Sequence, residues 1–170
     1  MDVRHAYVDG PVGRLLLVAG DDALMGLYFP RYRYTPPPSS WGRRVETSAD
    51  PLLAQAESEL GEYFAGERQV FDVPAVTNGD EFQERVWAQL REIPYGERIT
   101  YGDIAVELGS KGFAQIVGQA VGRNPVSIVI PCHRVIGAGG KLTGFGGGLE
   151  RKQILLDLEE PPEARAERLF

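Results

Sequence analysis

Cysteine, histidine and long apolar runs are scarce in this chain of 170 residues, which has one cysteine and two histidines. The single cysteine excludes an intramolecular disulfide, and these few side chains fall short of the four Cys or His ligands of a typical structural zinc site. No apolar run approaches the roughly 18–20 residues that span a bilayer, and the amino terminus lacks the basic-then-apolar pattern of a secretory signal. The sequence therefore predicts a soluble, cytoplasmic protein with no metal site and no membrane contact.

Positive charge is also in short supply, because 18 Lys and Arg residues face 24 Asp and Glu residues, a net charge of −6. Non-specific nucleic-acid binding depends mainly on neutralising phosphates, so this balance argues against a protein that coats nucleic acid. It does not exclude a local basic face. Residues 1–79 hold 7 basic and 11 acidic residues and residues 80–170 hold 11 and 13, so charge alone identifies no partner.

The first half of the chain has the pattern of a small α+β unit. Three apolar runs separated by Gly- and Asp-containing turns predict a β-meander, at residues 3–8, 14–19 and 23–29. Residues 31–48, rich in Pro, Ser and Arg, predict a surface loop. Asp50 and Pro51 predict the start of a helix that ends at Gly66, and residues 69–73 predict a further strand.

The second half begins with a helical pattern. Apolar spacing predicts one helix over residues 82–93, and the pair Thr100 and Asp103 has the spacing of a capping box that opens a short helix. After a glycine-containing turn, residues 113–121 predict another helix. Two short helices across such a turn have the outline of a helix-turn-helix, although an ordinary packed helix pair has the same pattern.

The candidate chemistry lies at residues 131–134, which read Pro-Cys-His-Arg and follow a β-branched run at 127–130 that predicts a strand. A cysteine at the end of a strand, next to His133 and Arg134, is placed where positive charge and a nearby base favour the thiolate. A buried, unreactive cysteine fits the same pattern. A cysteine protease needs a histidine remote in sequence, and the only remote one is His5.

The segment from Gly137 to Gly148 is rich in glycine but matches no nucleotide-binding motif. Gly140-Lys141 is followed by Leu142 rather than Ser or Thr, and no Gly-x-Gly-x-x-Gly is present. The segment instead predicts a flexible loop beside Cys132, whose backbone can approach a flat ligand closely. No cofactor is therefore expected.

Residues 131–137, Pro-Cys-His-Arg-Val-Ile-Gly, are similar to the active-site motif of the O6-alkylguanine-DNA alkyltransferases. The resemblance covers residues 80–160 clearly, and the first half resembles the small ribonuclease-H-like domain of that family, in its zinc-free bacterial branch. Further segments fall in the family's order and spacing: Phe82-Gln83-x-x-Val86-Trp87, Ile93-Pro94-Tyr95-Gly96, Thr100-Tyr101-Gly102, Val117-Gly118, Asn124-Pro125, Leu142-Thr143-Gly144 and Gly147-Gly148.

This resemblance implies an α+β fold, with a ribonuclease-H-like α/β domain at residues 1–78 and a mostly helical domain with a winged helix-turn-helix-like motif at residues 79–170. It implies a monomeric DNA repair protein that binds duplex DNA containing O6-alkylguanine and rotates the damaged base out of the stack. The alkyl group would then pass irreversibly to Cys132 in a single turnover. Displacement at an alkyl carbon suits a soft thiolate and needs no metal.

The resemblance also implies roles for individual residues. Cys132 is the nucleophile, His133 accepts its proton through a water molecule, and Glu159 orients the histidine. Asn124 braces the turn before the active site, and Tyr101 hydrogen-bonds the flipped base. The remaining expected residues line the substrate pocket (Val135, Phe145 and Gly146) or contact DNA (Phe113, Gln115, Ile116, Gly118 and Arg123).

The chain departs from the family at the predicted recognition helix. The family usually has Ala-Arg-Ala-Val-Gly there, whereas residues 114–118 read Ala-Gln-Ile-Val-Gly, which puts Gln115 in the position of the base-replacing arginine. Phe145 stands where many members have tyrosine. Two other functions remain open: a module that binds alkylation damage without repairing it, and a cysteine that accepts alkyl groups from a small molecule or free base.

Overall fold

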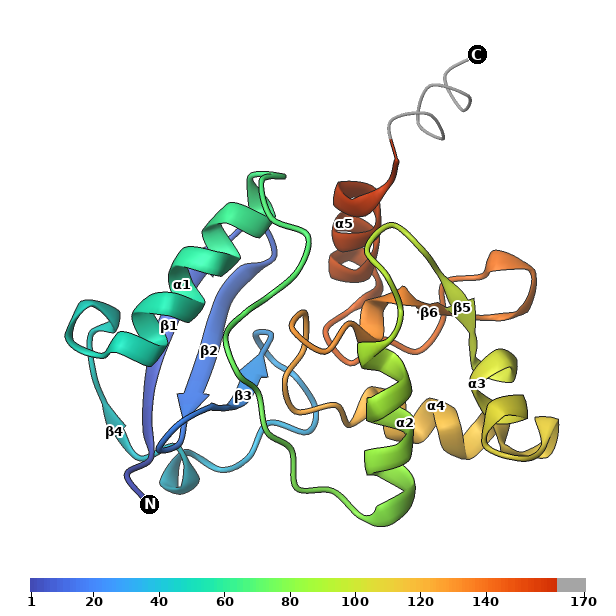
Figure 1. The fold of residues 1–170 in the computed structure, drawn as a ribbon, viewed down its shortest axis with the longest axis horizontal. Helices are drawn as coiled ribbons and strands as arrows, with labels where there is room; N and C mark the ends of the chain where they lie inside the picture. The colour runs from blue at the N-terminus through green and yellow to red at the C-terminus, as the bar shows by residue number, and fades with distance from the viewer. Residues whose placement is uncertain (162–170) are drawn as a thin grey trace.

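The computed structural model describes residues 1–161, and its first part is a four-stranded sheet covered by one helix (Figure 1). The sheet contains β1 (Arg4–Gly10), β2 (Gly13–Ala19), β3 (Leu24–Tyr28) and β4 (Arg43–Arg44), in the order β3-β2-β1-β4. The first three strands pair antiparallel, as the meander pattern predicts, and β4 adds to β1 in parallel.

Alternation along the strands gives the sheet two different faces. On one face, Ala6, Leu15 and Leu17 are buried in the main core beneath α1 (Pro51–Phe64). Asp50 caps this helix by accepting a hydrogen bond from the Leu53 backbone N–H, as the sequence predicts. The opposite face carries a smaller cluster of buried residues: Leu16, Val18, Tyr28 and Tyr32.

Two predictions for the first part need correction. The predicted strand at residues 69–73 is absent, because the carboxylate of Glu59 accepts hydrogen bonds from the Asp72 and Val73 N–H groups at 2.8 and 3.0 Å in place of a neighbouring strand. The predicted loop at 31–48 is more ordered than its composition suggests. It contains β4 and two 3₁₀ turns, Pro38–Ser40 and Thr47–Ala49.

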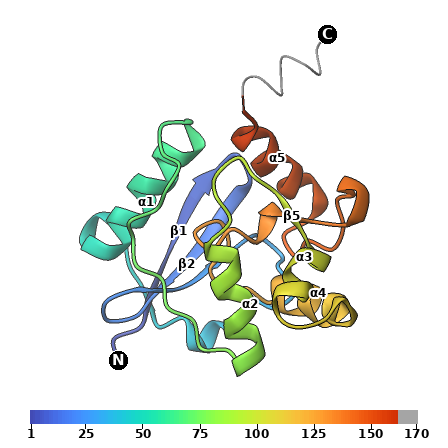
Figure 2. The same cartoon turned by 45° about the vertical axis from the view of Figure 1, so that its right-hand side comes forward.

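The second part is mostly helical (Figure 2). Its helices are α2 (Glu81–Arg91), α3 (Tyr101–Glu107), α4 (Ala114–Gly122) and α5 (Leu149–Glu159), and a short parallel pair joins β5 (Ile99–Thr100) to β6 (Val135–Ile136). Thr100 and Asp103 form the predicted capping box at the start of α3. A 3₁₀ turn at Lys111–Phe113 links α3 to α4 and gives the predicted helix-turn-helix outline.

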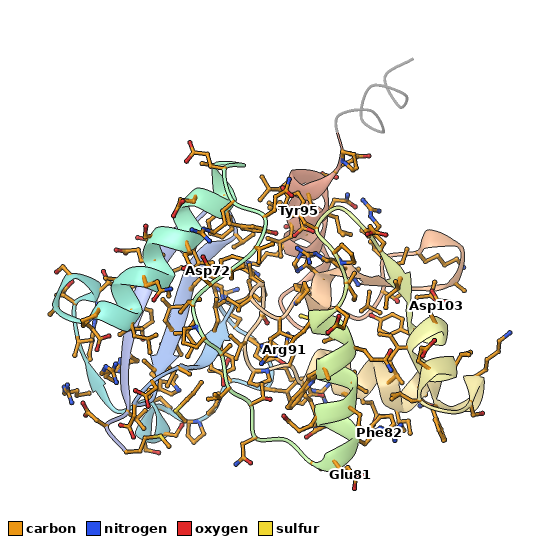
Figure 3. All side chains as sticks on the ribbon, in the orientation of Figure 1. Asp72, Glu81, Phe82, Arg91, Tyr95 and Asp103 are labelled. Atoms are coloured by element: carbon orange, nitrogen blue, oxygen red, sulfur yellow. The ribbon has the colours of Figure 1, made fainter. Side chains whose placement is uncertain are left out.

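Helix α2 ties the second part together at both of its ends. Phe82, labelled at the lower end of α2 in Figure 3, makes an edge-to-face contact with Phe113 at a centroid distance of 6.3 Å. Beyond the other end, Tyr95 donates a hydrogen bond to the Leu158 carbonyl of α5 at 3.2 Å. These contacts fix the helix-turn-helix and α5 relative to α2.

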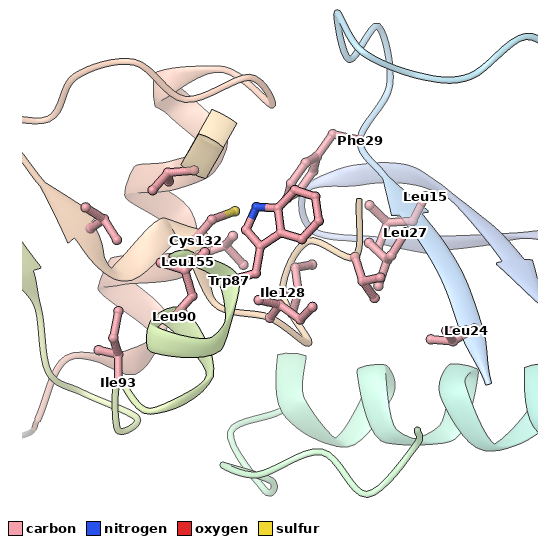
Figure 4. Packing of buried hydrophobic residues seen from close by; sticks show 14 of the residues in the cluster. Leu15, Leu24, Leu27, Phe29, Trp87, Leu90, Ile93, Ile128, Cys132 and Leu155 are labelled. Atoms are coloured by element: carbon pink, nitrogen blue, oxygen red, sulfur yellow. The ribbon is translucent and has the colours of Figure 1, made fainter. Parts of the chain in front are cut away.

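One hydrophobic core runs through both parts of the chain. In Figure 4, Trp87 of α2 lies between Cys132 on one side and Phe29 on the other, with Leu27 and Ile128 close by. The Leu27 N–H donates to the Pro125 carbonyl at 2.8 Å, so backbone pairing reinforces the packing. The cysteine is therefore part of this shared core rather than of a surface loop.

Within the described residues, no helix has both the length and the apolar character needed to cross a membrane.

Candidate active site

The segment before the cysteine is a tight turn, not the strand that its β-branched residues predict. Ile128 has a φ of +72°, and the Ile130 N–H closes the turn on the Val126 carbonyl at 2.9 Å. Burial of Ile128 and Ile130 in the core outweighs β propensity here, which is a weak preference set largely by packing. The turn delivers Cys132 into the interior at the start of a 3₁₀ turn that spans Cys132–Arg134.

Asn124 holds this turn in place. Its side-chain nitrogen donates to the Ile130 carbonyl at 2.7 Å, while its side-chain oxygen accepts from the Val126 N–H at 3.1 Å. Asn124 is 1% exposed, so these bonds form in a low-dielectric interior where they are hard to replace.

The Cys132 thiol is buried, and its surroundings act on its pKa in opposite directions. Burial raises the pKa, while hydrogen bonds from Asn124 and Ser127 and the positive charge of Lys152 lower it. The sulfur therefore lies in the hydrophobic core, and the three polar groups Asn124, Ser127 and Lys152 favour the thiolate there.

Next to the cysteine, His133 is completely buried and contacts Glu159 of α5, with 2.6 Å between Nε2 and a carboxylate oxygen. Burial lowers the pKa of His133 although Glu159 opposes this, so the neutral ring is favoured. With its proton on Nε2 facing Glu159, the ring has Nδ1 as its acceptor, and Nδ1 has no hydrogen-bond partner among residues 1–161. Nδ1 is thus the atom that can take up a proton.

Both oxygens of the Glu159 carboxylate accept hydrogen bonds. Arg134 donates to it from Nε at 2.7 Å and from Nη2 at 3.1 Å, and the hydroxyl of Tyr63 donates to the oxygen that also faces His133. Burial alone would raise the pKa of Glu159, but its partners His133 and Arg134 lower it to about 2. Glu159 is therefore ionised at neutral pH.

The position of Arg134 differs from the sequence-based expectation. Its guanidinium was expected to favour the thiolate directly, but it is engaged with Glu159 and with the Ile93 carbonyl, at 2.6 Å from Nη1. The cation that lowers the pKa of Cys132 is instead Lys152.

Lys152 is buried in α5 and links two segments around the cysteine. Its Nζ donates to the Val135 carbonyl at 2.5 Å and to the Thr143 carbonyl at 3.3 Å. Burial lowers the pKa of Lys152 to about 8. The ammonium group thus ties the glycine-rich segment to the strand that follows Cys132.

The expected pocket residues lie around this link. The Tyr101 hydroxyl donates to the Thr143 carbonyl at 3.1 Å, and Val135 is completely buried. Phe145 makes an edge-to-face contact with Phe29, with 5.4 Å between the ring centres. A side chain at Gly146 would collide with the ring of Tyr32, so only glycine allows this close approach.

The expected DNA-contacting residues lie on or beside α4. Phe113 is 36% exposed and Ile116 is 43% exposed, although both are large apolar side chains. Gln115 is exposed between them, Gly118 is half-buried, and Arg123 is exposed just beyond the end of the helix. This face of α4 has the exposed apolar residues that a surface with a partner would carry.

Sequence reasoning missed three residues of the site: Tyr63, Ser127 and Lys152. One signal was available for Lys152, because it occupies the buried stripe of α5 with Leu155, Leu156 and Glu159 at helical spacing. A lysine in a buried stripe indicates polar partners in the interior, because a buried charge without partners is costly. Tyr63 and Ser127 carry no comparable signal, since a tyrosine or serine at a buried position is ordinary.

Comparison with known families now identifies the class of protein. The family model for the "6-O-methylguanine DNA methyltransferase, ribonuclease-like domain" matches residues 3–75, and the model for the "6-O-methylguanine DNA methyltransferase, DNA binding domain" matches residues 81–161. The four-stranded sheet with its helix thus corresponds to the ribonuclease-like domain, and the helix-turn-helix with the cysteine to the DNA-binding domain.

Individual relatives match over nearly the whole chain. A methylated-DNA--protein-cysteine methyltransferase of Mycolicibacterium paratuberculosis is 46% identical over 168 residues, covering 99% of both chains. The namesake from Haemophilus influenzae is 41% identical and covers 93% of this chain and 87% of its own. The crystal structure of Mycobacterium tuberculosis OGT in complex with DNA is similar with a TM-score of 0.82 and 42% identity, covering 95% of this chain and 97% of the other. The chain belongs to the 6-O-methylguanine DNA methyltransferase family.

Proposed function

We propose that this protein repairs O6-alkylguanine in duplex DNA by moving the alkyl group onto its own Cys132, once per molecule. The observation that carries the proposal is the buried His133–Glu159 pair directly after the buried Cys132, in a chain whose relatives are named methylated-DNA--protein-cysteine methyltransferases. A structural relative was crystallised with DNA, which supports duplex DNA as the partner.

In the proposed reaction, the thiol proton of Cys132 passes to Nδ1 of His133 through a water molecule. The thiolate then attacks the alkyl carbon, a new carbon–sulfur bond forms, and the carbon–O6 bond breaks. The electron pair of the broken bond remains on the guanine, which is protonated as it leaves. A thioether is not a leaving group under these conditions, so each molecule reacts once.

The surrounding residues support this step in the proposal. Glu159 accepts the proton of Nε2 and stabilises the positive charge that His133 gains. Asn124 and Ser127 hydrogen-bond the developing thiolate, and Lys152 stabilises its charge. In the proposal, Tyr101 hydrogen-bonds the flipped base, and Val135, Phe145 and Gly146 line the pocket.

Glu159 also receives a hydrogen bond from the other part of the chain, through Tyr63 of α1. We expect Tyr63→Phe to lower the transfer rate, because the shared carboxylate oxygen loses a donor and with it the geometry that orients His133. Loss of a hydrogen bond to a charged group costs about 1.5–3 kcal/mol. A pH–rate profile with free O6-benzylguanine measures the effect, and the profile should shift because the change reaches the titrating histidine.

A merely structural role for Tyr63 predicts a different outcome. The variant would then lose thermal stability while its pH–rate profile kept the position of the unchanged protein. Phe64→Leu, one residue along the same helix, serves as the matched control because the half-buried Phe64 side chain makes no hydrogen bond to Glu159.

A substitution at Gln115 tests how the damaged base is rotated out of the duplex. Rotating a base out of a duplex costs a few kcal/mol, which a side chain that fills the gap partly offsets. Glutamine is shorter than arginine and offers no guanidinium plane. If α4 enters the DNA as the resemblance implies, Gln115→Arg should speed repair of O6-methylguanine in a duplex and leave the reaction with free O6-benzylguanine unchanged. Unchanged rates with both substrates would argue against α4 as the element that replaces the base.

The proposed function is tested by titrating O6-methylguanine-containing duplex DNA with the protein and measuring the lesion that remains. One lesion should disappear for each protein molecule, after which the reaction should stop. Tight binding with the lesion intact would indicate a module that only marks damage. Reaction with free alkylated bases but not with duplex DNA would indicate a small-molecule acceptor.

The proposal extends to the arrangement and place of action of the protein. We infer a division into a ribonuclease-like domain at residues 1–78 and a DNA-binding, alkyl-transfer domain at residues 79–170. We further infer that the protein acts as a monomer. We also infer that it acts in the cytoplasm, because chromosomal repair takes place where the DNA is.

A further inference from the structure

The outer face of the sheet carries exposed arginines stacked on aromatic rings, and the proposed reaction gives this feature no role. The rings belong to the small cluster on the side of the sheet opposite α1, together with the segment that follows β3. We call this surface the arginine face and define it by six residues: Tyr7, Arg14, Arg33, Tyr34, Arg44 and Arg123.

At one end of the arginine face, two guanidinium groups approach the same ring. The guanidinium carbon of Arg14 lies 4.1 Å from the centre of the Tyr7 ring, and that of Arg44 lies 4.9 Å from it. The two arginines come from different strands, β2 and β4, which flank β1 on its two sides. The sheet register thus brings two cations together over one tyrosine.

At the other end, Tyr34 is approached by Arg33 at 5.3 Å and by Arg123 at 4.2 Å. Arg123 directly follows α4, and the hydroxyl of Tyr32 donates to the Gly122 carbonyl at the end of that helix. The arginine face is therefore continuous with the proposed DNA-contacting helix. In Figure 1, β4 lies at the lower left of the molecule and α4 at its lower right, and the segment from β3 to β4 runs between them.

The four arginines of this face are exposed, and within residues 1–161 none of them forms an ion pair with a carboxylate. Asp9 lies opposite Arg14 in the strand register but makes no ion pair with it. Neighbouring Arg43, by contrast, is neutralised by Asp2. In a chain with a net charge of −6, four unpaired guanidinium groups on one face form a local positive surface.

We propose that the arginine face binds the phosphate backbone of duplex DNA beyond the lesion, as a second contact that extends the one made by α4. This inference rests on the proposed function. Guanidinium groups bind phosphate in a bidentate way, and charge complementarity supplies most of the affinity for a DNA backbone. Their stacking on rings also restricts the side chains beforehand, so less conformational freedom is lost on binding.

The chemistry of the face favours phosphates over bases as the ligand. Arg14 and Arg44 both lie against the ring of Tyr7, so a nucleobase that took either place would have to displace a guanidinium group. Sequence-independent contact with the backbone is also what a repair protein needs, because damage arises in any sequence.

The test compares the full-length protein with the double variant Arg14→Gln/Arg44→Gln on duplexes of two lengths. Both duplexes carry one central O6-methylguanine, and they span about one and about three helical turns (~10 base pairs per turn). On the long duplex, the variant should bind more weakly, and its slope of log affinity against log salt should be shallower by about 0.9 for each lost phosphate contact. On the short duplex, the two proteins should bind alike.

Control variants distinguish a failure of this proposal from a failure of the proposed function. Arg68→Gln removes one positive charge at a residue paired with Glu62 and Asp72, and it should leave both salt slopes unchanged. All variants should react with free O6-benzylguanine at the unaltered rate, which shows that the site is intact. If the original protein transfers no alkyl group, the proposed function fails. If it transfers normally and the double variant matches it on the long duplex, the arginine face serves only the fold.

Discussion

Replacing Cys132 with alanine or serine is expected to abolish alkyl transfer completely while leaving the fold and the binding of damaged DNA largely intact. The thiolate is the acceptor itself, and the chain has no second cysteine. A serine hydroxyl in the same buried place is far less acidic and far less nucleophilic toward an alkyl carbon. The loss is therefore not a slower rate but the absence of product.

The measurement is a single-turnover assay with excess protein and duplex DNA containing O6-methylguanine, followed until the unaltered protein has reacted fully. Thermal unfolding and DNA binding of the variants serve as controls, since removing one buried sulfur leaves only a small cavity. Stoichiometric loss of the methyl group from DNA with the alanine variant would remove Cys132 from the mechanism.

Replacing Glu159 with glutamine is expected to slow transfer by about 10²–10⁴-fold, the usual contribution of general-base assistance. The carboxylate holds His133 at 2.6 Å and supports its positive charge, which glutamine cannot do. DNA affinity should change little, because Glu159 is buried and belongs to α5 rather than to α4. Equal losses of rate and affinity would point to a role in folding alone. Glu150→Gln, the same change at an exposed position of α5, is the matched control.

The same variant has a signature in the pH dependence of stability. The pKa of Glu159 is lowered in the folded protein to about 2 from an ordinary value of 4.5, so its ionised form is bound more tightly by the fold. This contribution to the free energy of unfolding is fully present above pH 4.5 and is lost as the pH falls toward 2. The stability difference between the original protein and Glu159→Gln should therefore shrink over that acidic range.

Much of the fold follows from local sequence patterns. The three antiparallel strands, the Asp50 cap and the helix-turn-helix outline all appear where alternation, capping residues and helical spacing predict them. The two incorrect strands, at residues 69–73 and 127–130, fail for one physical reason. Each has the composition of a strand, but long-range contacts with Glu59 and with the core determine its backbone.

The candidate site was predictable where its residues are adjacent in the chain and not where they converge from afar. Cys132, His133 and Arg134 are contiguous, but nothing local shows that Arg134 is directed at Glu159 rather than at the sulfur. Tyr63 reaches the same carboxylate across 96 positions of sequence. Such convergence depends on the tertiary arrangement that brings the end of α1 to the end of α5, which spacing within one element does not reveal.

The mass of the protein after reaction tests the central claim most directly. Intact-mass spectrometry, followed by fragmentation of the peptide that contains Cys132, is carried out after incubation with duplex DNA bearing O6-methylguanine. The account predicts that each protein molecule gains one methyl group and that fragmentation places it on the sulfur of Cys132. An unchanged mass, or a methyl group on any other residue, would contradict it.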